Sequence, residues 1–262
     1  MEAKHYYENG QLQKAIAVIT EEIKKEPQAI NKRDFLCELL CIVGELERAD
    51  KQLDIIVQQD ARATVGAALM RQLIRAEEAR QQCFKDGRLP EFIGEPSASL
   101  QLHLQAMMEL REGSSRLACQ YLQQAEKKRP LVQGECNGKS FQGLRDLDDT
   151  CASFFEVLTS NGKYYWIAFE QVKQVEFRAP ERPIDLIWRR AHMTLFNGPE
   201  GEIFMPAIYV NTLPEDETAK LGHKTAWPGG EDKPVVGIGQ RLFLIGDNAI
   251  SMLEINELNR DG

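Results

Sequence analysis

Apolar side chains recur at helical spacing through the first half of the chain. In residues 10–27 they stand three or four positions apart behind a glycine, which predicts the buried face of an amphipathic helix. The same order of glycine, alanine five positions later and apolar stripe returns at an offset of 34 residues, and again in a third, slightly shifted copy. The glycines of the three copies are Gly10, Gly44 and Gly113, and the alanines are Ala15, Ala49 and Ala118.

This repeat predicts helical hairpins. Glycine allows a tight turn between two helices, and a small alanine lets the second helix approach the first. Pro27 and Pro130 end the helices of the first and third copies. The period resembles that of tetratricopeptide repeats, and the alternative is a generic bundle of α-hairpins whose periodicity arises by chance. Between the copies, residues 64–84 predict one long helix, residues 86–96 a loop and Ser97–Ser99 the start of the next helix.

The pattern changes to β behind residue 130. Residues 133–139 predict a linker or an exposed turn. Apolar runs then flank Asn161-Gly162 and Asn197-Gly198, and an Asn-Gly pair between such runs is a strong hairpin signal. Further strands are predicted at residues 172–177 and 241–245. Short strands at this spacing favour a small barrel-like sheet.

The sequence therefore predicts a multi-domain fold. Residues 1–130 are expected to form tetratricopeptide-like α-hairpin repeats, and residues 131–262 a smaller α+β domain with a barrel-like antiparallel sheet.

Composition and charge narrow the classes of partner. Hydrophobic side chains make up 43% of the 262 residues and charged ones 27%, which is ordinary for a soluble globular protein. The net charge of −8 is concentrated behind residue 130, where 13 basic side chains face 20 acidic ones. Such a surface repels phosphate backbones, so we expect no nucleic-acid partner. The sequence has no signal segment and no bilayer-spanning apolar run, so we expect a cytoplasmic protein without membrane insertion.

Side chains that could carry catalysis are sparse. None of the four histidines stands in a metal-binding spacing, and neither a nucleophile elbow nor a phosphate-binding glycine loop occurs. The six cysteines form no CxxC pair and are expected to be buried hydrophobic residues in a reducing compartment. We therefore expect no enzyme, no metal and no cofactor. The alternative is an uncharacterised enzyme with a site in the C-terminal β domain, built from Asp146, Asp148, Arg190 and His192.

Residues 178–191 form the most unusual segment, since they combine four arginines, two prolines and a tryptophan. Tryptophan and arginine are enriched in the hot spots of protein interfaces. Trp188, Arg189 and Arg190 are therefore candidates for protein binding. The alternative is that Trp188 belongs to the core and that Asp185 pairs with one arginine.

Several motifs together carry a resemblance to a known family. They are Arg71-Gln72-Leu73-Ile74-Arg75-Ala76-Glu77, Pro90-Glu91-Phe92, Leu158-Thr159, Tyr165-Trp166, Asp185-Leu186-Ile187-Trp188-Arg189-Arg190-Ala191 and Pro206-Ala207-Ile208-Tyr209. In these motifs, and from about residue 1 to about residue 250, the chain resembles the ImpE family, whose members are also called SciE or TagJ. One departure is Arg190, where the family pattern has proline, and it puts the local turn in doubt.

The resemblance implies a fold of tetratricopeptide-like hairpins followed by an α+β domain with a barrel-like sheet. It also implies an accessory role in the type VI secretion system, in which the protein binds the N-terminal helix of the small sheath protein TssB. A link to ClpV, the ATPase that recycles the contracted sheath, is implied as well. The resemblance brings no catalytic residues.

A stack of α-hairpins offers a groove for such a helix. By the tetratricopeptide consensus, the groove-facing residues are Asn31, Asp34 and Glu38 in the second copy and Leu100, His103, Met107 and Leu110 in the third. A mixed polar and methionine-containing surface suits an amphipathic helix. The function expected from the sequence is therefore that of a non-catalytic adaptor.

Overall fold

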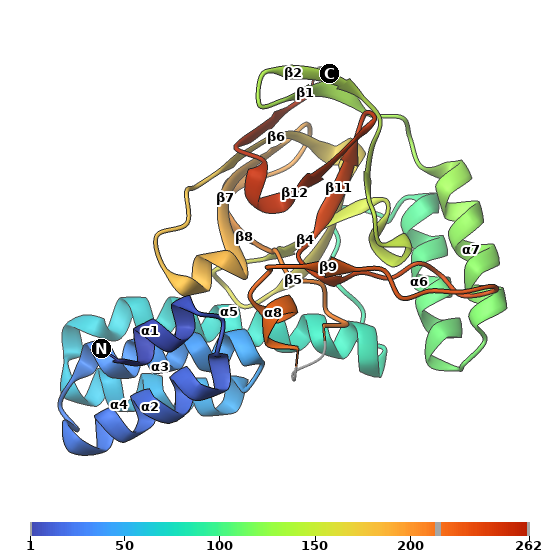
Figure 1. Ribbon diagram of the computed structural model, residues 1–262. Helices are drawn as coiled ribbons and strands as arrows, with labels where there is room; N and C mark the ends of the chain where they lie inside the picture. Colours follow the sequence, from blue (N-terminus) through green and yellow to red (C-terminus); the bar gives the residue numbers. More distant parts are fainter. Residues whose placement is uncertain (1, 213–215, 261–262) are drawn as a thin grey trace.

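The fold has a helical part at the N-terminus and a β-rich part behind it (Figure 1). A computed structural model describes residues 2–212 and 216–260. The helices are α1 (Glu2–Glu8), α2 (Leu12–Lys25), α3 (Ile30–Val43), α4 (Leu46–Gln59), α5 (Thr64–Asp86), α6 (Ala98–Arg111), α7 (Ser115–Lys128) and α8 (Glu217–Lys220). The long helix predicted at residues 64–84 and the helix predicted to start near Ser97 are confirmed as α5 and α6.

The repeated glycine and alanine form the turns and contacts of three helical hairpins. The glycines lie between α1 and α2, between α3 and α4 and between α6 and α7, with φ of 75°, 86° and 81°. Glycine reaches this left-handed region without the steric cost that a Cβ would bring. The alanine five positions later is 0% exposed in all three copies, so a larger side chain there would separate the helices. The predicted hairpins are confirmed, whereas their tetratricopeptide-like character stays a prediction.

The strands form one large antiparallel sheet and two small ones. They are β1 (Gln133–Cys136), β2 (Lys139–Gln142), β3 (Leu144–Asp146), β4 (Phe154–Leu158), β5 (Tyr164–Ala168), β6 (Val172–Phe177), β7 (Trp188–Leu195), β8 (Glu200–Pro206), β9 (Thr225–Ala226), β10 (Ile238–Gly239), β11 (Leu242–Ile245), β12 (Asn248–Ser251) and β13 (Glu257–Asn259). The large sheet has the order β2-β1-β13-β6-β7-β8-β4-β5, and the small sheets are β12-β11-β3 and β10-β9. Both predicted Asn-Gly hairpins are confirmed, β4–β5 and β7–β8.

The predicted barrel-like closure is not confirmed. In the described part of the chain, β2 and β5 are the two ends of the strand order and do not pair with each other. The sheet is therefore open along these edges.

Of the linker or exposed turn predicted at residues 133–139, the linker is wrong, and only Asn137 and Gly138 form an exposed turn. Gln133–Cys136 is strand β1, which pairs antiparallel with both β2 and β13. Asn137 and Gly138 have φ of 51° and 73°, the positive values that a two-residue hairpin turn requires. Gly134 is needed in β1, since a Cβ there would lie 2.1 Å from the carbonyl oxygen of Asn259. This segment therefore belongs to the sheet.

Strand β4 is buried on both faces and lies between two hydrophobic cores. Phe154 and Leu158 pack in a core shared with the helices, whereas Phe155 and Val157 pack in the core of the β-rich part. Because alternate side chains of a strand point to opposite faces, a consecutive apolar run suits this position. One core contains residues of both parts, so the division into domains at residues 130 and 131 stays a prediction.

A buried ionic network joins α5 to β4. Arg80 of α5 donates from Nε to Glu156 Oε1 at 2.9 Å and from Nη1 to Glu77 Oε1 at 3.1 Å. Arg241 also donates to Glu156, and its Nη1 donates to Asp146 Oδ2 at 2.9 Å. Burial alone would raise the pKa of Glu156, but Arg80 and Arg241 outweigh it and lower that pKa to about 2. Glu156 is therefore held as a carboxylate between two guanidinium groups.

Candidate functional site

The helical part contains a hollow between α3, α4 and α5. Its volume is about 550 Å³, and it is lined by Ile30, Asn31, Asp34, Leu53, Ile56, Asp60, Arg62, Ala63, Gly66, Ala67, Met70 and Arg182. The floor is apolar, because Leu53, Ile56 and Met70 are core residues at the inner faces of their helices. Asp34, Asp60 and Arg182 are among the charged residues of the lining.

A second hollow adjoins the first. Its volume is about 280 Å³, and it is lined by Gly66, Leu69, Met70, Leu73, Arg178, Ala179, Glu181, Arg182, Ile184, Asp185, Arg190 and Phe204. Gly66, Met70 and Arg182 line both hollows, so Arg182 stands where they meet. We call the two hollows together the α3–α5 groove.

Arg182 binds two carboxylates of α3. Asp34 and Glu38 are four positions apart, so they face the same side of the helix. Arg182 donates from Nη2 to Asp34 Oδ2 at 2.9 Å and from Nε to Glu38 Oε1 at 2.7 Å. Burial raises the pKa of Glu38 to about 7, although Arg182 acts to lower it. The two carboxylates and the guanidinium thus form a partly buried ion cluster at the groove.

The segment of residues 178–187, which carries Arg182, is a fixed turn. Asp185 Oδ2 accepts hydrogen bonds from the backbone N–H groups of Glu181 and Arg182, both at 2.9 Å. Ile184 is 6% exposed and packs in the core shared with the helices. These contacts hold the segment against α3 and aim the Arg182 side chain at its carboxylates.

Four residues selected from the sequence lie at this groove. Asn31 and Asp34 line the larger hollow, Arg190 lines the smaller one, and Glu38 is reached through Arg182. Their role in partner binding stays a prediction. Sequence reasoning missed Arg182, although it lies in the arginine-rich segment that the composition had singled out.

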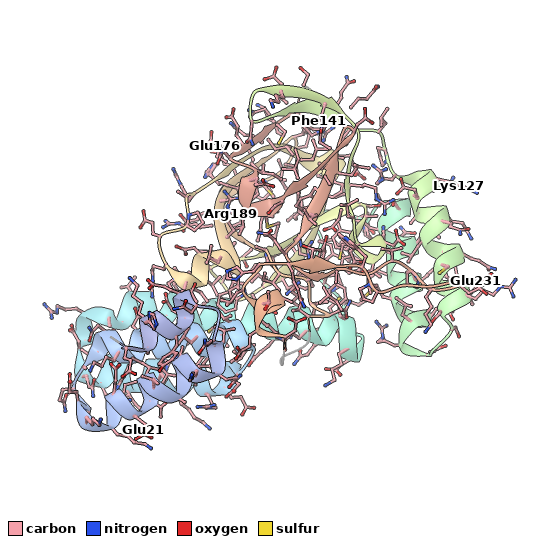
Figure 2. All side chains as sticks on the ribbon, viewed as in Figure 1. Glu21, Lys127, Phe141, Glu176, Arg189 and Glu231 are labelled. Atoms are coloured by element: carbon pink, nitrogen blue, oxygen red, sulfur yellow. The ribbon has the colours of Figure 1, made fainter. Side chains whose placement is uncertain are left out.

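Trp188 and Arg189 lie in the interior, at 3% and 2% exposure. Trp188 Nε1 donates to Glu77 Oε2 at 3.3 Å. Arg189, labelled in Figure 2, donates to the carbonyl of Met252, and its guanidinium carbon lies 4.5 Å from the centre of the Phe177 ring. The alternative, in which Trp188 belongs to the core, therefore holds, and a role of these two residues in protein binding stays a prediction.

Arg190 differs from its neighbour because successive side chains of β7 point to opposite faces. Its side chain is 53% exposed and pairs with Glu202 of β8. The position where the family pattern has proline is thus an outward-facing residue in a continuous strand, and no turn occurs there.

In the third hairpin, three selected residues are buried where the helices pack against the β-rich part. Leu100, His103 and Met107 are 2%, 1% and 4% exposed. His103 Nε2 lies 3.0 Å from Ser153 Oγ, and its ring meets the Phe154 ring edge-on at 5.5 Å. The open groove predicted at these positions is wrong, because η2 (Asp149–Cys151) and the start of β4 pack on the inner face of α6.

Leu110, the fourth residue selected on this hairpin, is half-buried against the small cluster formed with α7.

Met107→Ala is expected to lower the free energy of unfolding by about 2 kcal/mol, because it removes a buried side chain from the shared core. Chemical denaturation measures the loss. The Kd of any ligand of the α3–α5 groove, expressed per folded molecule, should stay unchanged. A weakened affinity at unchanged stability would mean that Met107 contacts a partner instead.

The site of the alternative enzyme is not assembled. Asp146 and Asp148 are buried and accept hydrogen bonds from this chain's own groups, including Tyr209 Oη at 2.7 Å and the Gly237 N–H at 2.7 Å. Arg190 and His192 lie on β7, where β8 supplies Glu202 as their neighbour. Across residues 2–212 and 216–260, no hydrogen bond or ion pair joins the two aspartates to Arg190 or His192. In the same residues no group of three or more His, Cys, Asp or Glu side chains is placed to hold a metal ion.

The fold and the groove define a protein of helical hairpins and an open antiparallel sheet, with a charged, apolar-floored groove where the two parts meet. None of the helices described here is both long and apolar enough to cross a membrane.

Comparison with known proteins confirms the resemblance found in the sequence motifs. Residues 138–259 match the model of the ImpE family, described as ImpE protein. The chain is 29% identical to the type VI secretion system accessory component TagJ of Pseudomonas aeruginosa over 99% of this chain and 91% of that protein. The crystal structure of protein VPA1032 from Vibrio parahaemolyticus is similar in fold, with a TM-score of 0.94, 26% identity and coverage of 100% of this chain and 98% of that chain.

Proposed function

We propose that this chain is an accessory protein of a type VI secretion system that binds a helix of a partner protein and catalyses no reaction. The observation that carries the proposal is the 29% identity with the accessory component TagJ over 99% of this chain. A relationship of this extent includes both the helical and the β-rich part. It therefore supports a common role for the whole fold.

The α3–α5 groove supports helix binding as the mechanism. An amphipathic helix buries its apolar face in a hydrophobic groove and keeps its polar face at the rim. The apolar floor on α4 and α5 and the charged side chains on α3 and the 178–187 segment fit that division. The proposed occupant is the N-terminal helix of the small sheath protein TssB, which the family resemblance implies.

Further parts of the proposal rest on the sequence patterns and on the family resemblance. They are a cytoplasmic location, a link to the ClpV ATPase, a tetratricopeptide-like stacking of the hairpins, and separate folding units at residues 1–130 and 131–262.

Calorimetric titration of the full chain tests helix binding. The probe is a synthetic peptide that covers the N-terminal helix of the TssB encoded in the same gene cluster. We expect a Kd in the micromolar range, corresponding to roughly −8 kcal/mol. A peptide of the same composition in scrambled order is the control. Because burial of apolar surface changes the heat capacity, the titration is run at several temperatures. No heat at any of them would contradict the helix-binding mechanism.

A further inference from the structure

We infer that Asp34 and Glu38 form the subsite for a lysine or arginine of the bound helix, and that Arg182 fills this subsite in the free protein. The inference rests on the proposed helix-binding function and adds the chemistry that the groove selects.

The carboxylate pair requires a cation. Like charges one helical turn apart repel each other, and Glu38 is only 3% exposed, so water screens it poorly. Arg182 supplies the cation with two hydrogen bonds, at 2.7 and 2.9 Å. The structure thus displays the geometry in which this pair accepts a guanidinium group.

Arg182 reaches the pair from a segment that is distant in sequence and lies at the surface. It is separated from Glu38 by 144 positions, and its side chain is 47% exposed. The 178–187 segment keeps its own anchors, since Ile184 packs in the core and Asp185 binds two backbone N–H groups. The Arg182 side chain can therefore leave its carboxylates without releasing the segment.

The position of Arg182 obstructs a long ligand. Arg182 lines both hollows, so a ligand that occupies both has to pass it. A helix that extends through both must displace this side chain. Displacement leaves Glu38 buried without a partner, which is unfavourable unless the helix brings its own cation. The net charge of −8 also attracts a basic helix at long range.

The groove therefore selects an amphipathic helix with a basic residue beside its apolar stripe. Arg182 acts as an internal competitor for the same subsite. A helix without a basic residue therefore binds more weakly, because it must displace Arg182 and brings no cation for Glu38.

Two peptides and four chains test the inference. The first peptide is the TssB helix described above, and the second has every lysine and arginine of that helix replaced by glutamine. Both are titrated at one ionic strength with the wild-type chain, with Arg182→Gln, with Asp34→Asn and with Arg116→Gln. Arg116 lies exposed on α7, outside the groove, so its replacement removes the same charge without touching the subsite.

We expect the wild-type chain to bind the native peptide about fivefold more tightly than the glutamine peptide, the upper range for one solvent-accessible ion pair. Arg182→Gln should raise the affinity for the native peptide by about fivefold and raise that for the glutamine peptide as well, because both helices displace the same competitor in the wild-type chain. Arg116→Gln should behave as wild type. Asp34→Asn, at a half-exposed position, should reduce the preference for the native peptide.

Other outcomes overturn the inference. If both peptides bind all chains equally well, the subsite does not distinguish a basic residue from glutamine. The proposed helix binding then stands without the basic-residue subsite. If Arg182→Gln weakens both peptides, Arg182 supports the groove and does not compete. If neither peptide binds any chain, the proposed function fails and the inference fails with it.

Discussion

Glu156→Gln is expected to lower the free energy of unfolding by about 3–5 kcal/mol, because it leaves two buried guanidinium groups without their shared carboxylate. Arg80 and Arg241 are 4% and 1% exposed, so water cannot replace the lost charge. The glutamine amide is almost the same size as the carboxylate, and therefore the loss reports charge and hydrogen bonding more than volume. Urea denaturation followed by circular dichroism measures the change.

Glu202→Gln is the matched control. Its partner Arg190 is 53% exposed, and such a surface pair contributes about 0–1 kcal/mol. Equal stability losses in the two variants would mean that Glu156 is not the centre of the network.

The network has a consequence for the groove. Arg80 lies on α5, which forms a wall of the groove, and Glu156 lies in the same sheet as β7, which follows the Arg182 segment. Weaker contacts between α5 and β4 would let α5 and the Arg182 segment, which lie on two sides of the groove, move apart. Glu156→Gln should therefore reduce peptide affinity as well as stability, although Glu156 itself does not line the groove.

Local signals in the sequence were sufficient for most of the secondary structure. Gly44 followed by Ala49 predicts a turn and a close helix contact, and the structure has both, with φ of 86° and an exposure of 0%. Asn161-Gly162 predicts a hairpin for a similar reason. Asn137-Gly138 carries the same signal, but its flanking strands are short and polar, so the pattern favoured a linker. Pairing with β13, more than a hundred positions away, decides that segment.

Long-range contacts explain why the candidate site was found only in part. Asn31 and Asp34 face the groove because helix periodicity and the hairpin repeat are local properties. Leu100 and Met107 have the same local pattern, yet they are buried in the core shared by the helices and the β-rich part, and no repeat consensus contains that information. In the same way, Arg182 meets Glu38 only through the packing of the β-rich part on α3.

Glu156, which links β4 to α5, is a further residue whose partners could not be predicted from the sequence. It lies within the apolar run Phe154-Phe155-Glu156-Val157-Leu158, where a charge is unexpected. A buried carboxylate in such a strand implies a buried cation on the facing element. The sequence alone does not identify that cation, because α5 and the segment before β11 carry several arginines and lysines.

The ion cluster at the groove is expected to make the stability of the protein depend on pH through Glu38. Burial, together with the negative charges of Asp34 and Asp185, raises the pKa of this carboxyl from 4.5 to about 7, against the opposing effect of Arg182. The folded protein therefore holds a proton on Glu38 at pH values where the unfolded chain has released it. Its stabilising contribution is present below pH 4.5 and is lost as the pH rises through 7.

Glu38→Gln removes this titration and keeps an oxygen for Arg182. Relative to wild type, the variant should gain about 3 kcal/mol in free energy of unfolding between pH 5 and pH 8, at 1.36 kcal/mol for each pKa unit. Asp146, whose pKa burial also raises to about 7, titrates in both proteins, so the difference between the two denaturation curves isolates Glu38. A difference that stays constant from pH 5 to pH 8 would mean that Glu38 is already ionised and fully compensated by Arg182.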